Sequence, residues 1–389
     1  MQHRFEPEPF RRVAVAAPDL TGNEEAYVVA AVRSGWVSSS GEFLERFERE
    51  FAAACGTRHA VACSSGTTAL HLALATLGVG RGDEVIVPAT TFVATANAVR
   101  FCNATPVFVD VDPETWCLDP RGVVAAIGPR TVGIIPVHLL GHPADMDAIN
   151  AIAEQHGLWV VEDAAEATFA TYRGRPVGGL ADAAAFSFFG NKIVTSGEGG
   201  AVTFSRDDLA KRMRMLRGHG MDPARRYHFP IVGFNYRMSN LTAALACAQL
   251  ERRDALVARR RAIVRRYDEQ LRLQPGLTHR TDAPWAGVSP WLVAVVVDRD
   301  NFGLDRDAVA AGRAGRGIET RPVFPPLHRR PPSRRLAARQ GIASLPVAEW
   351  LGASGLMLPT HPLMTDDDVA FVCEASAAAG RGHARRRTA

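Results

Sequence analysis

The sequence predicts an α/β protein with a mainly parallel sheet that helices cover on both faces. Short apolar runs, typical of strands buried on both faces, occupy residues 84–87, 107–111, 133–137 and 158–163. Helical patterns separate these runs, at residues 92–101, 119–127 and 145–156. This alternation of strand and helix is typical of a parallel sheet. In such sheets ligands bind beyond the carboxyl ends of the strands. We therefore expect Asp163, which ends the fourth run, to lie at a binding site or to serve as a helix N-cap.

The N-terminal part of the chain predicts an arm followed by two helices. Residues 1–22 are expected to be extended, because prolines that prevent a helix stand at Pro7, Pro9 and Pro18. A helix is expected to begin after Asn23, a good N-cap, and to end near residue 35. A second helix has one apolar face, made by Phe43, Phe47 and Phe51. The loop between the helices contains Trp36 and Ser38, and it is either a plain connection or part of a sugar pocket.

The second half of the chain predicts a strand, a turn and a strand around Lys192, followed by a smaller domain. The strands are expected at 183–189 and 200–204, with an arginine-rich helix at 207–217. A long helix from about 241 to 272 leads to a region with strands at 290–297 and 317–324 and a helix at 305–311. The predicted division is an arm at 1–22, a large cofactor-binding domain at 23–250, a small domain with the linking helix at 251–378, and a basic, disordered tail at 379–389.

Composition argues against several classes of function. The chain has 389 residues, of which 47% are hydrophobic and 22% charged, as in ordinary globular proteins. It begins without the apolar run of a signal peptide and has no stretch as long as a membrane span, so we expect a cytoplasmic protein without membrane contact. Six cysteines lack the spacing of zinc ligands or of a disulfide framework, so we expect no metal and six reduced thiols. The arginine-rich segments have almost no interleaved aromatic residues, which argues against nucleic-acid binding.

Lys192 is the first candidate for chemistry. The chain has 45 basic residues, and because only Lys192 and Lys211 are lysines, the other 43 are arginines. An arginine stays protonated, whereas a lysine amine can lose its proton and form a Schiff base. A lysine kept between an aromatic strand and a glycine-rich turn therefore indicates that the amine itself is needed. The alternative is an ordinary surface lysine.

The turn Ser65-Gly-Thr67 is a second candidate, because it leads directly into an apolar helix. The first turn of a helix presents free N–H groups, and together with the hydroxyls they would hold a phosphate. The turn is not a Walker loop, since Gly-x-x-x-x-Gly-Lys-Ser/Thr does not occur in the chain. Taken alone, a simple N-cap explains it better.

Four motifs stand in a defined order along the chain: Ser65-Gly-Thr67, Glu162-Asp-Ala-Ala-Glu166, Ser187 to Gly200, and Gly233-Phe-Asn-Tyr-Arg237. Together they resemble the sugar aminotransferases of the DegT/DnrJ/EryC1/StrS type, which use pyridoxal 5′-phosphate (PLP). The similarity covers roughly residues 20–375, and four motifs in order are far more specific than any one of them. The resemblance implies an aspartate aminotransferase-like, type I fold, with a mainly parallel seven-stranded sheet in the large domain.

The resemblance also implies a set of cofactor contacts. Lys192 would bind PLP as a Schiff base and would move protons during the reaction. Asp163 would keep the pyridine nitrogen protonated, which makes the ring an electron sink. Glu166 would lie near the edge of the ring, and Phe92 would stack on it unless it packs in the core instead. The phosphate would be held by four residues, the last of them from the neighbouring subunit: Gly66, Thr67, Ser187 and Asn235.

The same resemblance implies substrates and a partner. Because Asn235 would come from a second copy of the chain, the protein would be a homodimer with shared active sites. Within the family the motifs are most similar to the GDP-perosamine synthases, as in Trp36-Val-Ser-Ser and Arg321-Pro-Val-Phe324. L-Glutamate would donate the amino group, and a nucleotide-linked 4-keto-6-deoxy sugar, GDP-4-keto-6-deoxymannose, would accept it. The residues expected to contact this substrate are Trp36, Ser38, Arg237 and His328.

Departures from the usual family pattern keep other functions open. They occur at Ser65, Phe169 and Ser196 and in the basic segment 325–339, whose arginines suit a diphosphate or an ordinary solvated surface. Because they fall where the nucleotide and sugar would bind, a 3-keto sugar or a keto-cyclitol from antibiotic biosynthesis remains an alternative acceptor. A sugar dehydratase of the same fold is a second alternative, although deoxygenating relatives tend to lack the lysine. A non-catalytic, cofactor-binding regulator is a third.

Overall fold

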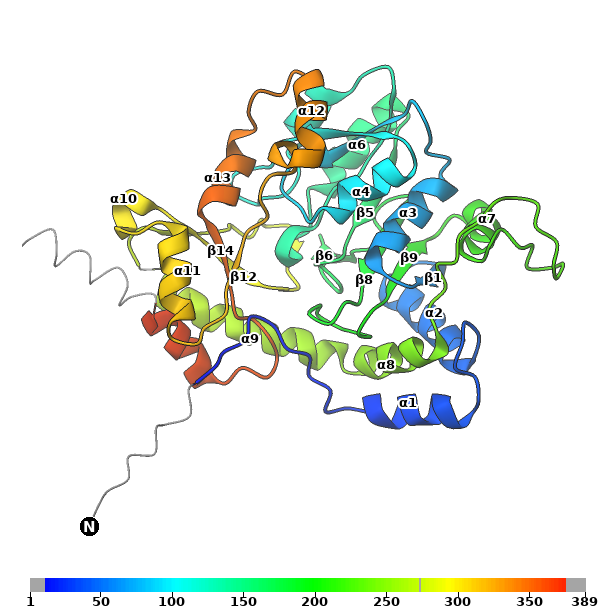
Figure 1. The fold of residues 1–389 in the computed structure, drawn as a ribbon, viewed down its shortest axis with the longest axis horizontal. Coiled ribbons are helices and arrows are strands. Elements are labelled where there is room, and N and C mark those ends of the chain that lie inside the picture. The colour runs from blue at the N-terminus through cyan, green and yellow to red at the C-terminus, as the bar shows by residue number, and fades with distance from the viewer. Residues whose placement is uncertain (1–10, 273, 376–389) are drawn as a thin grey trace, which may run out of the picture.

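A seven-stranded sheet forms the centre of the computed structural model, which describes residues 11–272 and 274–375 (Figure 1). The strands lie in the order β1-β9-β8-β5-β4-β2-β3. Strand β9 is antiparallel to both of its neighbours, and the remaining pairs are parallel. The predicted α/β class and mainly parallel seven-stranded sheet are confirmed. The bounds in chain order are β1 His59–Cys63, β2 Glu84–Pro88, β3 Thr105–Val109, β4 Thr131–Ile134, β5 Trp159–Asp163, β8 Ala183–Ser187 and β9 Gly200–Phe204.

Helices cover both faces of this sheet, which explains why its strands are apolar on both sides. One face packs against α3 (Gly66–Thr76), α4 (Ala94–Phe101) and α7 (Asp207–Arg217). The other face packs against α2 (Glu42–Ala54), α5 (Pro120–Ala126), α6 (Met146–His156) and α8 (Asn240–Glu251). Side chains alternate between the two faces along β5: Val161 packs in the core under α3, α4 and α7, and Val160 packs in the core on the opposite face.

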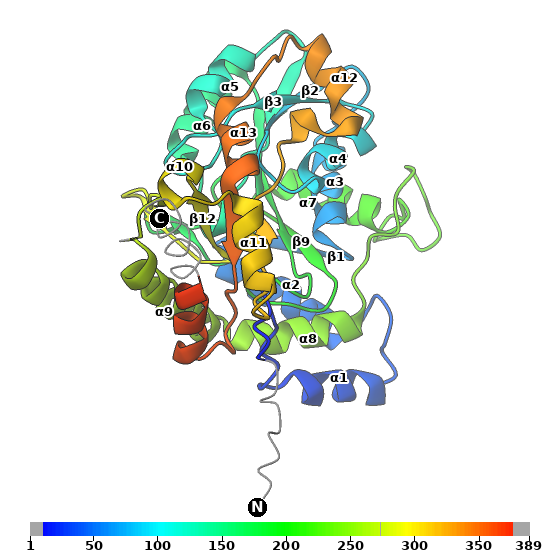
Figure 2. The same cartoon turned by 60° about the vertical axis from the view of Figure 1, so that its left-hand side comes forward.

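A second, four-stranded antiparallel sheet lies in the C-terminal part of the chain, in the order β10-β12-β14-β13. Its strands are β10 Leu277–His279, β12 Val293–Val297, β13 Arg321–Pro322 and β14 Gly355–Leu358. The helices around it are α10 Arg299–Phe302, α11 Arg306–Ala314 and α13 Pro346–Ser354 (Figure 2). Helix α12 (Pro331–Arg339) lies beside α4 instead and packs on the core of the large sheet (Figure 2). A small third sheet joins β11 (Ala286–Gly287) to β6 (Thr171–Tyr172) and β7 (Arg175–Pro176).

The predicted N-terminal arm is extended where the structure describes it, from residue 11 onward. Val13 forms a parallel bridge with Ile318, so the arm adds to the edge of the C-terminal part. Helix α1 (Glu24–Arg33) begins as expected with Asn23 at the N-cap position, but the Asn23 side chain makes no capping hydrogen bond. Its Nδ2 donates instead to Glu251 Oε2 at 2.9 Å. Residues 1–10 of the arm and the predicted tail at 379–389 lie outside the described residues, and the proposed division into domains stays a prediction.

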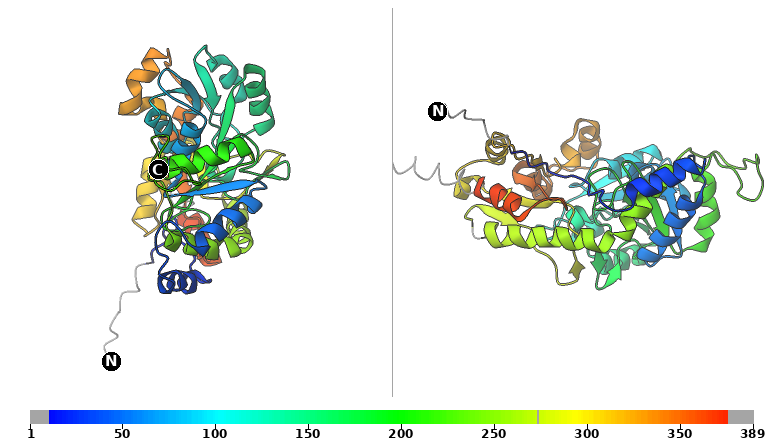
Figure 3. Two further views of the ribbon diagram at one scale, coloured as in Figure 1. Left: turned by 90° about the vertical axis from the view of Figure 1, so that its right-hand side faces the viewer. Right: turned by 90° about the horizontal axis from the view of Figure 1, so that it is seen from below.

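The long helix predicted at 241–272 is wrong in one respect, because two helices occupy this stretch. Helix α8 ends at Glu251, and α9 (Arg253–Leu271) follows, with α8 and α9 running end to end along the molecule (Figure 3). The break falls at Arg252, whose guanidinium binds both carboxylate oxygens of Asp19 at 2.9 and 3.1 Å. Charge pattern and helix propensity do not reveal this contact, because its partners are 233 residues apart.

Two predicted strands of the C-terminal region are shorter than expected. The strand at 317–324 reduces to Arg321–Pro322, and the strand at 290–297 reduces to Val293–Val297. The basic segment 325–339 forms a 3₁₀ turn, η2 (Leu327–Arg329), followed by α12. Within residues 11–272 and 274–375, the structure has no helix both long enough and apolar enough to cross a membrane.

Candidate active site

A cavity of about 580 Å³ brings together the seven residues predicted to bind the cofactor from within one subunit. It opens where β5 and β8 end, between the large sheet and residues of the C-terminal part such as Trp291 and Arg321. This position agrees with the rule that ligands bind at the carboxyl ends of parallel strands. The seven residues are Gly66, Thr67, Phe92, Asp163, Glu166, Ser187 and Lys192.

One end of the cavity is formed by the first turn of α3. Ser65 caps the helix by accepting a hydrogen bond from the Thr68 amide, and the Thr68 hydroxyl accepts one from the Ser65 amide. This capping box leaves the N–H groups of Gly66 and Thr67 without a partner in the helix. A Cβ atom on Gly66 would come within 2.7 Å of Ser187 Cβ, so glycine allows the helix to approach β8. The turn therefore caps the helix and also presents free N–H groups that can bind an anion.

Asp163 points into the same cavity from the end of β5 and is only 5% exposed. Its Oδ2 accepts a hydrogen bond from the Thr95 hydroxyl at 2.7 Å, and its Oδ1 accepts one from the Ala165 amide at 3.3 Å. Burial raises the pKa of the Asp163 carboxyl, while Thr95, Ala165 and Lys192 act in the opposite direction. A turn follows β5 rather than a helix, so the alternative that Asp163 is an N-cap is wrong.

Lys192 lies in the turn between β8 and β9, with its Nζ 4.0 Å from the centroid of the Trp291 ring. Burial lowers the pKa of its amine; Glu166 and Asp163 oppose this shift, and Arg321 adds to it. The turn is held by the C-terminal part, because the Trp291 indole donates to the Asn191 carbonyl at 2.8 Å. Lys211 differs, because it is an exposed residue of α7 with Asp222 3.3 Å away. Lys192 is therefore not an ordinary surface lysine.

Glu166 completes a cluster of two acids and one amine. It is buried, and its Oε2 accepts a hydrogen bond from the Leu140 amide at 2.9 Å. Burial raises the pKa of Glu166 to about 7, although Lys192 and the Leu140 amide oppose this rise. Within this cluster a proton can thus be held or released near neutral pH.

An aromatic wall faces the cluster. Phe92 is 56% exposed and meets Phe324 edge-on, with ring centroids 6.0 Å apart. Phe324 in turn stacks on Trp291 at 6.5 Å. Because Phe92 is exposed, it is not a core residue, and the alternative of core packing is wrong. Its ring is free to contact a ligand.

The remaining predicted residues do not line this cavity within one subunit. Asn235 is exposed and accepts hydrogen bonds from Arg237, which also contacts His219. Trp36 and Ser38 are exposed, and their carbonyls accept hydrogen bonds from Asn240. His328 is 2% exposed, and its Nε2 lies 2.8 Å from Glu349 Oε1. The substrate contacts of these residues, and the phosphate contact of Asn235, stay predictions.

Four residues were missed from sequence: Trp291, Arg321 and Arg330, which line the cavity, and Thr95, which lies behind it. Thr95 holds Asp163, Trp291 covers Lys192, and Arg321 and Arg330 bring positive charge to the wall. Of the basic segment 325–339, Arg330 is the arginine that lines the cavity. Arg321 begins the motif Arg321-Pro-Val-Phe324, so the family resemblance could have pointed to it. Neither Thr95 nor Trp291 stands in a distinctive local pattern.

Comparisons with known proteins identify the family of the chain. The profile of the DegT/DnrJ/EryC1/StrS aminotransferase family matches residues 18–376. A curated relative, the GDP-perosamine synthase of Caulobacter vibrioides, is 50% identical over 362 residues, which cover 92% of this chain and 95% of the relative.

Solved structures of similar proteins give the same result for the fold. DesV of S. venezuelae, solved with a ketimine intermediate, superposes with a TM-score of 0.86 at 39% identity, covering 92% of this chain and 94% of that one. The PLP form of the putative sugar aminotransferase Spr1654 from Streptococcus pneumoniae has a TM-score of 0.88 at 28% identity, with 96% and 99% coverage. The predicted resemblance and type I fold are confirmed, and the chain belongs to the DegT/DnrJ/EryC1/StrS aminotransferase family.

Proposed function

We propose that the protein transfers an amino group from L-glutamate, through PLP, to the ketone of a nucleotide-linked 4-keto-6-deoxy sugar. The preferred acceptor is GDP-4-keto-6-deoxymannose, because the relative that is 50% identical over 92% of the chain is a GDP-perosamine synthase. The observation that carries the proposal is the joining of Lys192, Asp163 and the start of α3 in one cavity. Family membership supports the aminotransferase class, and the name of the relative supports the sugar.

Three features of the cavity fit PLP. The free N–H groups at the start of α3, beside Ser187, suit its phosphate, and the glycine at 66 leaves the room that a Cβ would fill. The buried Asp163 carboxylate suits a protonated pyridine nitrogen, since that cation would compensate the cost of burying the acid. Lys192 supplies the amine that the cofactor's aldehyde requires.

Each of these residues has a chemical task in amino-group transfer. When bound, PLP supplies an electron sink for the electrons released as a proton leaves the carbon beside the nitrogen. Asp163 keeps a proton on the ring nitrogen, which strengthens that sink. Lys192 accepts and returns the proton at carbon, and its lowered pKa favours the neutral amine that this requires. Trp291 packs over Lys192 and limits where the amine can move.

The active form is proposed to be a homodimer with shared sites. The segment after α7 extends away from the body of the subunit (Figure 1), and it exposes Tyr227, Phe229 and Val232. Such exposed apolar side chains are typical of a surface that another chain covers. Asn235 follows this segment directly, so a second copy of the chain is well suited to receive it at its own phosphate site.

The alternatives differ in what supports them. A dehydratase of the same fold is disfavoured by Lys192, whose amine is what transamination needs. A non-catalytic regulator would not require a lysine with a lowered pKa beside two buried acids. A 3-keto sugar or a keto-cyclitol would use the same cluster, so these acceptors have to be separated by experiment.

The experiment is a panel of GDP-, dTDP- and UDP-linked keto sugars, each incubated with the PLP-loaded protein and L-glutamate and followed by mass spectrometry. We expect an amino product from the GDP-linked 4-keto sugar, with slower or no conversion of the others. Conversion of a 3-keto sugar or a cyclitol alone would replace the proposed acceptor. Absence of an amino product with every ketone would overturn the nucleotide-sugar assignment.

A further inference from the structure

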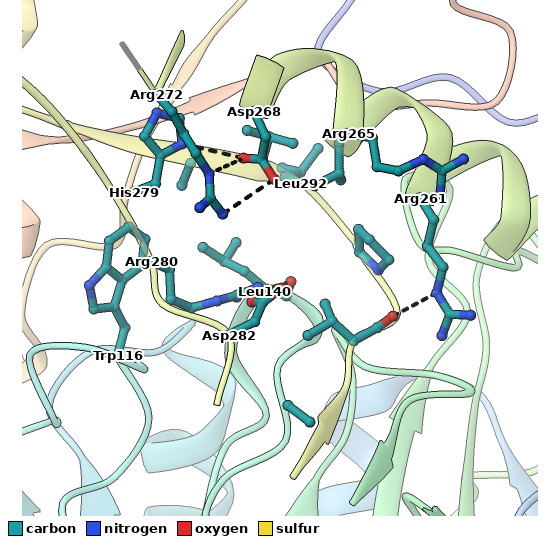
Figure 4. Close-up of a pocket in the computed structure, with 16 residues that line it drawn as sticks. Trp116, Leu140, Arg261, Arg265, Asp268, Arg272, His279, Arg280, Asp282 and Leu292 are labelled. Atoms are coloured by element: carbon teal, nitrogen blue, oxygen red, sulfur yellow. Dashed lines mark hydrogen bonds and ion pairs between the residues drawn. The ribbon is translucent and has the colours of Figure 1, made fainter. Parts of the chain in front are cut away.

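A second cavity, of about 300 Å³, lies between α9 and the first strands of the C-terminal sheet (Figure 4). It shares no lining residue with the active site. The segment 290–292 separates the two cavities, because Trp291 lines the active site whereas Pro290 and Leu292 line the second cavity. The site is therefore distinct from the one described above, although it is adjacent to it.

The wall of this cavity carries more positive than negative charge. Arg272 and His279 lie 3.5 and 3.8 Å from Asp268, and Arg280 lies 3.2 Å from Asp282. Arg261 and Arg265 have no carboxylate partner among the described residues. The Arg261 guanidinium donates to the Val288 carbonyl at 2.9 Å. The charged side chains of the wall are the four arginines Arg261, Arg265, Arg272 and Arg280 and the two aspartates Asp268 and Asp282.

Two nitrogen atoms of lining residues are buried without a hydrogen-bond partner in the described part of the chain: Nε of Arg280 and Nε2 of His279. Their side chains are only 14% and 12% exposed. Buried polar atoms are almost always hydrogen-bonded, so these two nitrogens show that the polar groups of the wall are not all satisfied within the described chain. The donors that can reach a ligand in the cavity are the exposed guanidinium groups of Arg261, Arg265 and Arg272.

We propose that this cavity binds a small anion that carries two linked phosphate groups. Guanidinium groups bind phosphate oxygens in pairs and favour such planar, charge-assisted contacts. The arginines are distributed from α9 across to the segment after β10, which suits two phosphate groups better than one (Figure 4). Arg280 is the most buried member of the set, so its attraction for an anion is screened least, whereas Arg261, Arg265 and Arg272 are exposed and act in a more screened surrounding.

Arg280 also connects this cavity to the active site. Its Nη1 donates to the carbonyls of Leu139 and Leu140 at 3.1 and 3.4 Å, and the Leu140 amide holds Glu166 at 2.9 Å. A change at Arg280 would therefore disturb Glu166 in the active-site cavity as well as the anion site. Arg265 and Arg272 are better test positions, because no hydrogen bond or ion pair described for them involves an active-site residue.

The test is calorimetric titration of the PLP-loaded protein with pyrophosphate. Loading with PLP keeps pyrophosphate out of the phosphate site at α3, and the visible absorbance of the bound cofactor reports that it stays in place. We expect saturable binding that falls at least about tenfold in the double variant Arg265→Gln/Arg272→Gln. The matched control is Arg253→Gln, an arginine of the same helix that lies outside the cavity and has Asp254 at 3.7 Å, and it should bind as the wild type does.

A second titration, with guanosine diphosphate, identifies the source of the phosphates. The binding step that disappears in the double variant is the one at this cavity. Tighter wild-type binding of the nucleotide than of pyrophosphate in that step would assign the cavity to nucleotides, and equal or weaker binding would assign it to free diphosphate. No saturable binding, or equal weakening in Arg253→Gln, would overturn the proposal without affecting the transfer of amino groups.

Discussion

Glu162 and Asp163 are consecutive acids at the end of β5, and both are buried, yet their surroundings are opposite. Glu162 faces the core, where His138 Nε2 lies 3.0 Å from its carboxylate and the Gly178 and Leu180 amides donate at 2.9 Å. Asp163 faces the active-site cavity and has one hydroxyl and one amide as donors within the described chain. Because side chains alternate along a strand, neighbouring residues face opposite sides of the sheet. The carboxylate of Glu162 is fully hydrogen-bonded in the core, whereas the carboxylate of Asp163 can still accept hydrogen bonds from a ligand.

The largest effect that tests this comparison is expected at Asp163. Asparagine keeps the shape of the side chain but cannot hold a positive charge on the pyridine nitrogen. We expect Asp163→Asn to lower kcat on the order of 10²- to 10³-fold, as removal of one key electrostatic contact does. Thermal unfolding should change little, since the substitution also removes a buried acid with a raised pKa. A variant that is fully active but unstable would place Asp163 with Glu162 as a structural residue.

The converse result is expected at Glu162. Glutamine would turn an amide group toward atoms that already donate, so at least one buried hydrogen bond would be lost. We expect Glu162→Gln to lower the free energy of unfolding by about 2 to 3 kcal/mol, measured by chemical denaturation of the PLP-loaded protein. The molecules that remain folded should keep the wild-type KM values. Unchanged stability would show that the three contacts to Glu162 are not needed.

A smaller effect is expected at Thr95, the hydroxyl that holds Asp163. Valine has nearly the same shape but no donor, so the carboxylate would lose its shortest hydrogen bond. We expect Thr95→Val to weaken PLP about 5- to 10-fold, corresponding to about 1 kcal/mol, in an equilibrium titration followed by absorbance. Thr76→Val is the matched control, because its hydroxyl caps a carbonyl within α3 at Leu72. Equal losses in both variants would attribute the effect to general stability.

The smallest effect concerns the pH dependence of Glu166 in the protein without PLP. The pKa of its carboxyl rises on folding from the ordinary 4.5 to about 7, so the folded state binds the proton more tightly. The resulting stabilisation is present below pH 4.5 and is lost as the pH rises through about 7. Relative to Glu166→Gln, the wild type should lose on the order of 1 kcal/mol of stability between about pH 6 and pH 7. Parallel curves for the two proteins would contradict the raised pKa.

The features that could be predicted from the sequence are those with a local signature. The strands of the large sheet appear as apolar runs, and Lys192, Asp163 and the turn before α3 stand in short motifs next to recognisable elements. Thr95 and Trp291 could not be found in this way, because their partners Asp163 and Asn191 are 68 and 100 residues distant. Contacts across such separations depend on how the sheets pack, which local periodicity does not encode.

His328 illustrates a second limit. Its position after Pro-Val-Phe suggested a contact with the sugar, whereas within the subunit the imidazole is buried beside Glu349. The pKa of Glu349 is lowered to about 2, mainly by this hydrogen bond. The contact of His328 with Glu349 gives the histidine a structural task, and its contact with the sugar stays a prediction, because its sequence neighbours do not distinguish the two tasks.

The central claim is that Lys192 holds PLP in the cavity and passes an amino group through it. The most direct measurement is the visible absorbance of the PLP-loaded wild type and of Lys192→Ala before and after L-glutamate is added. We expect a yellow wild type that bleaches with glutamate and recovers its colour when the keto sugar is added, whereas Lys192→Ala shows neither change. A wild type that stays colourless after incubation with PLP, or that keeps its colour with every amino donor, would contradict the claim.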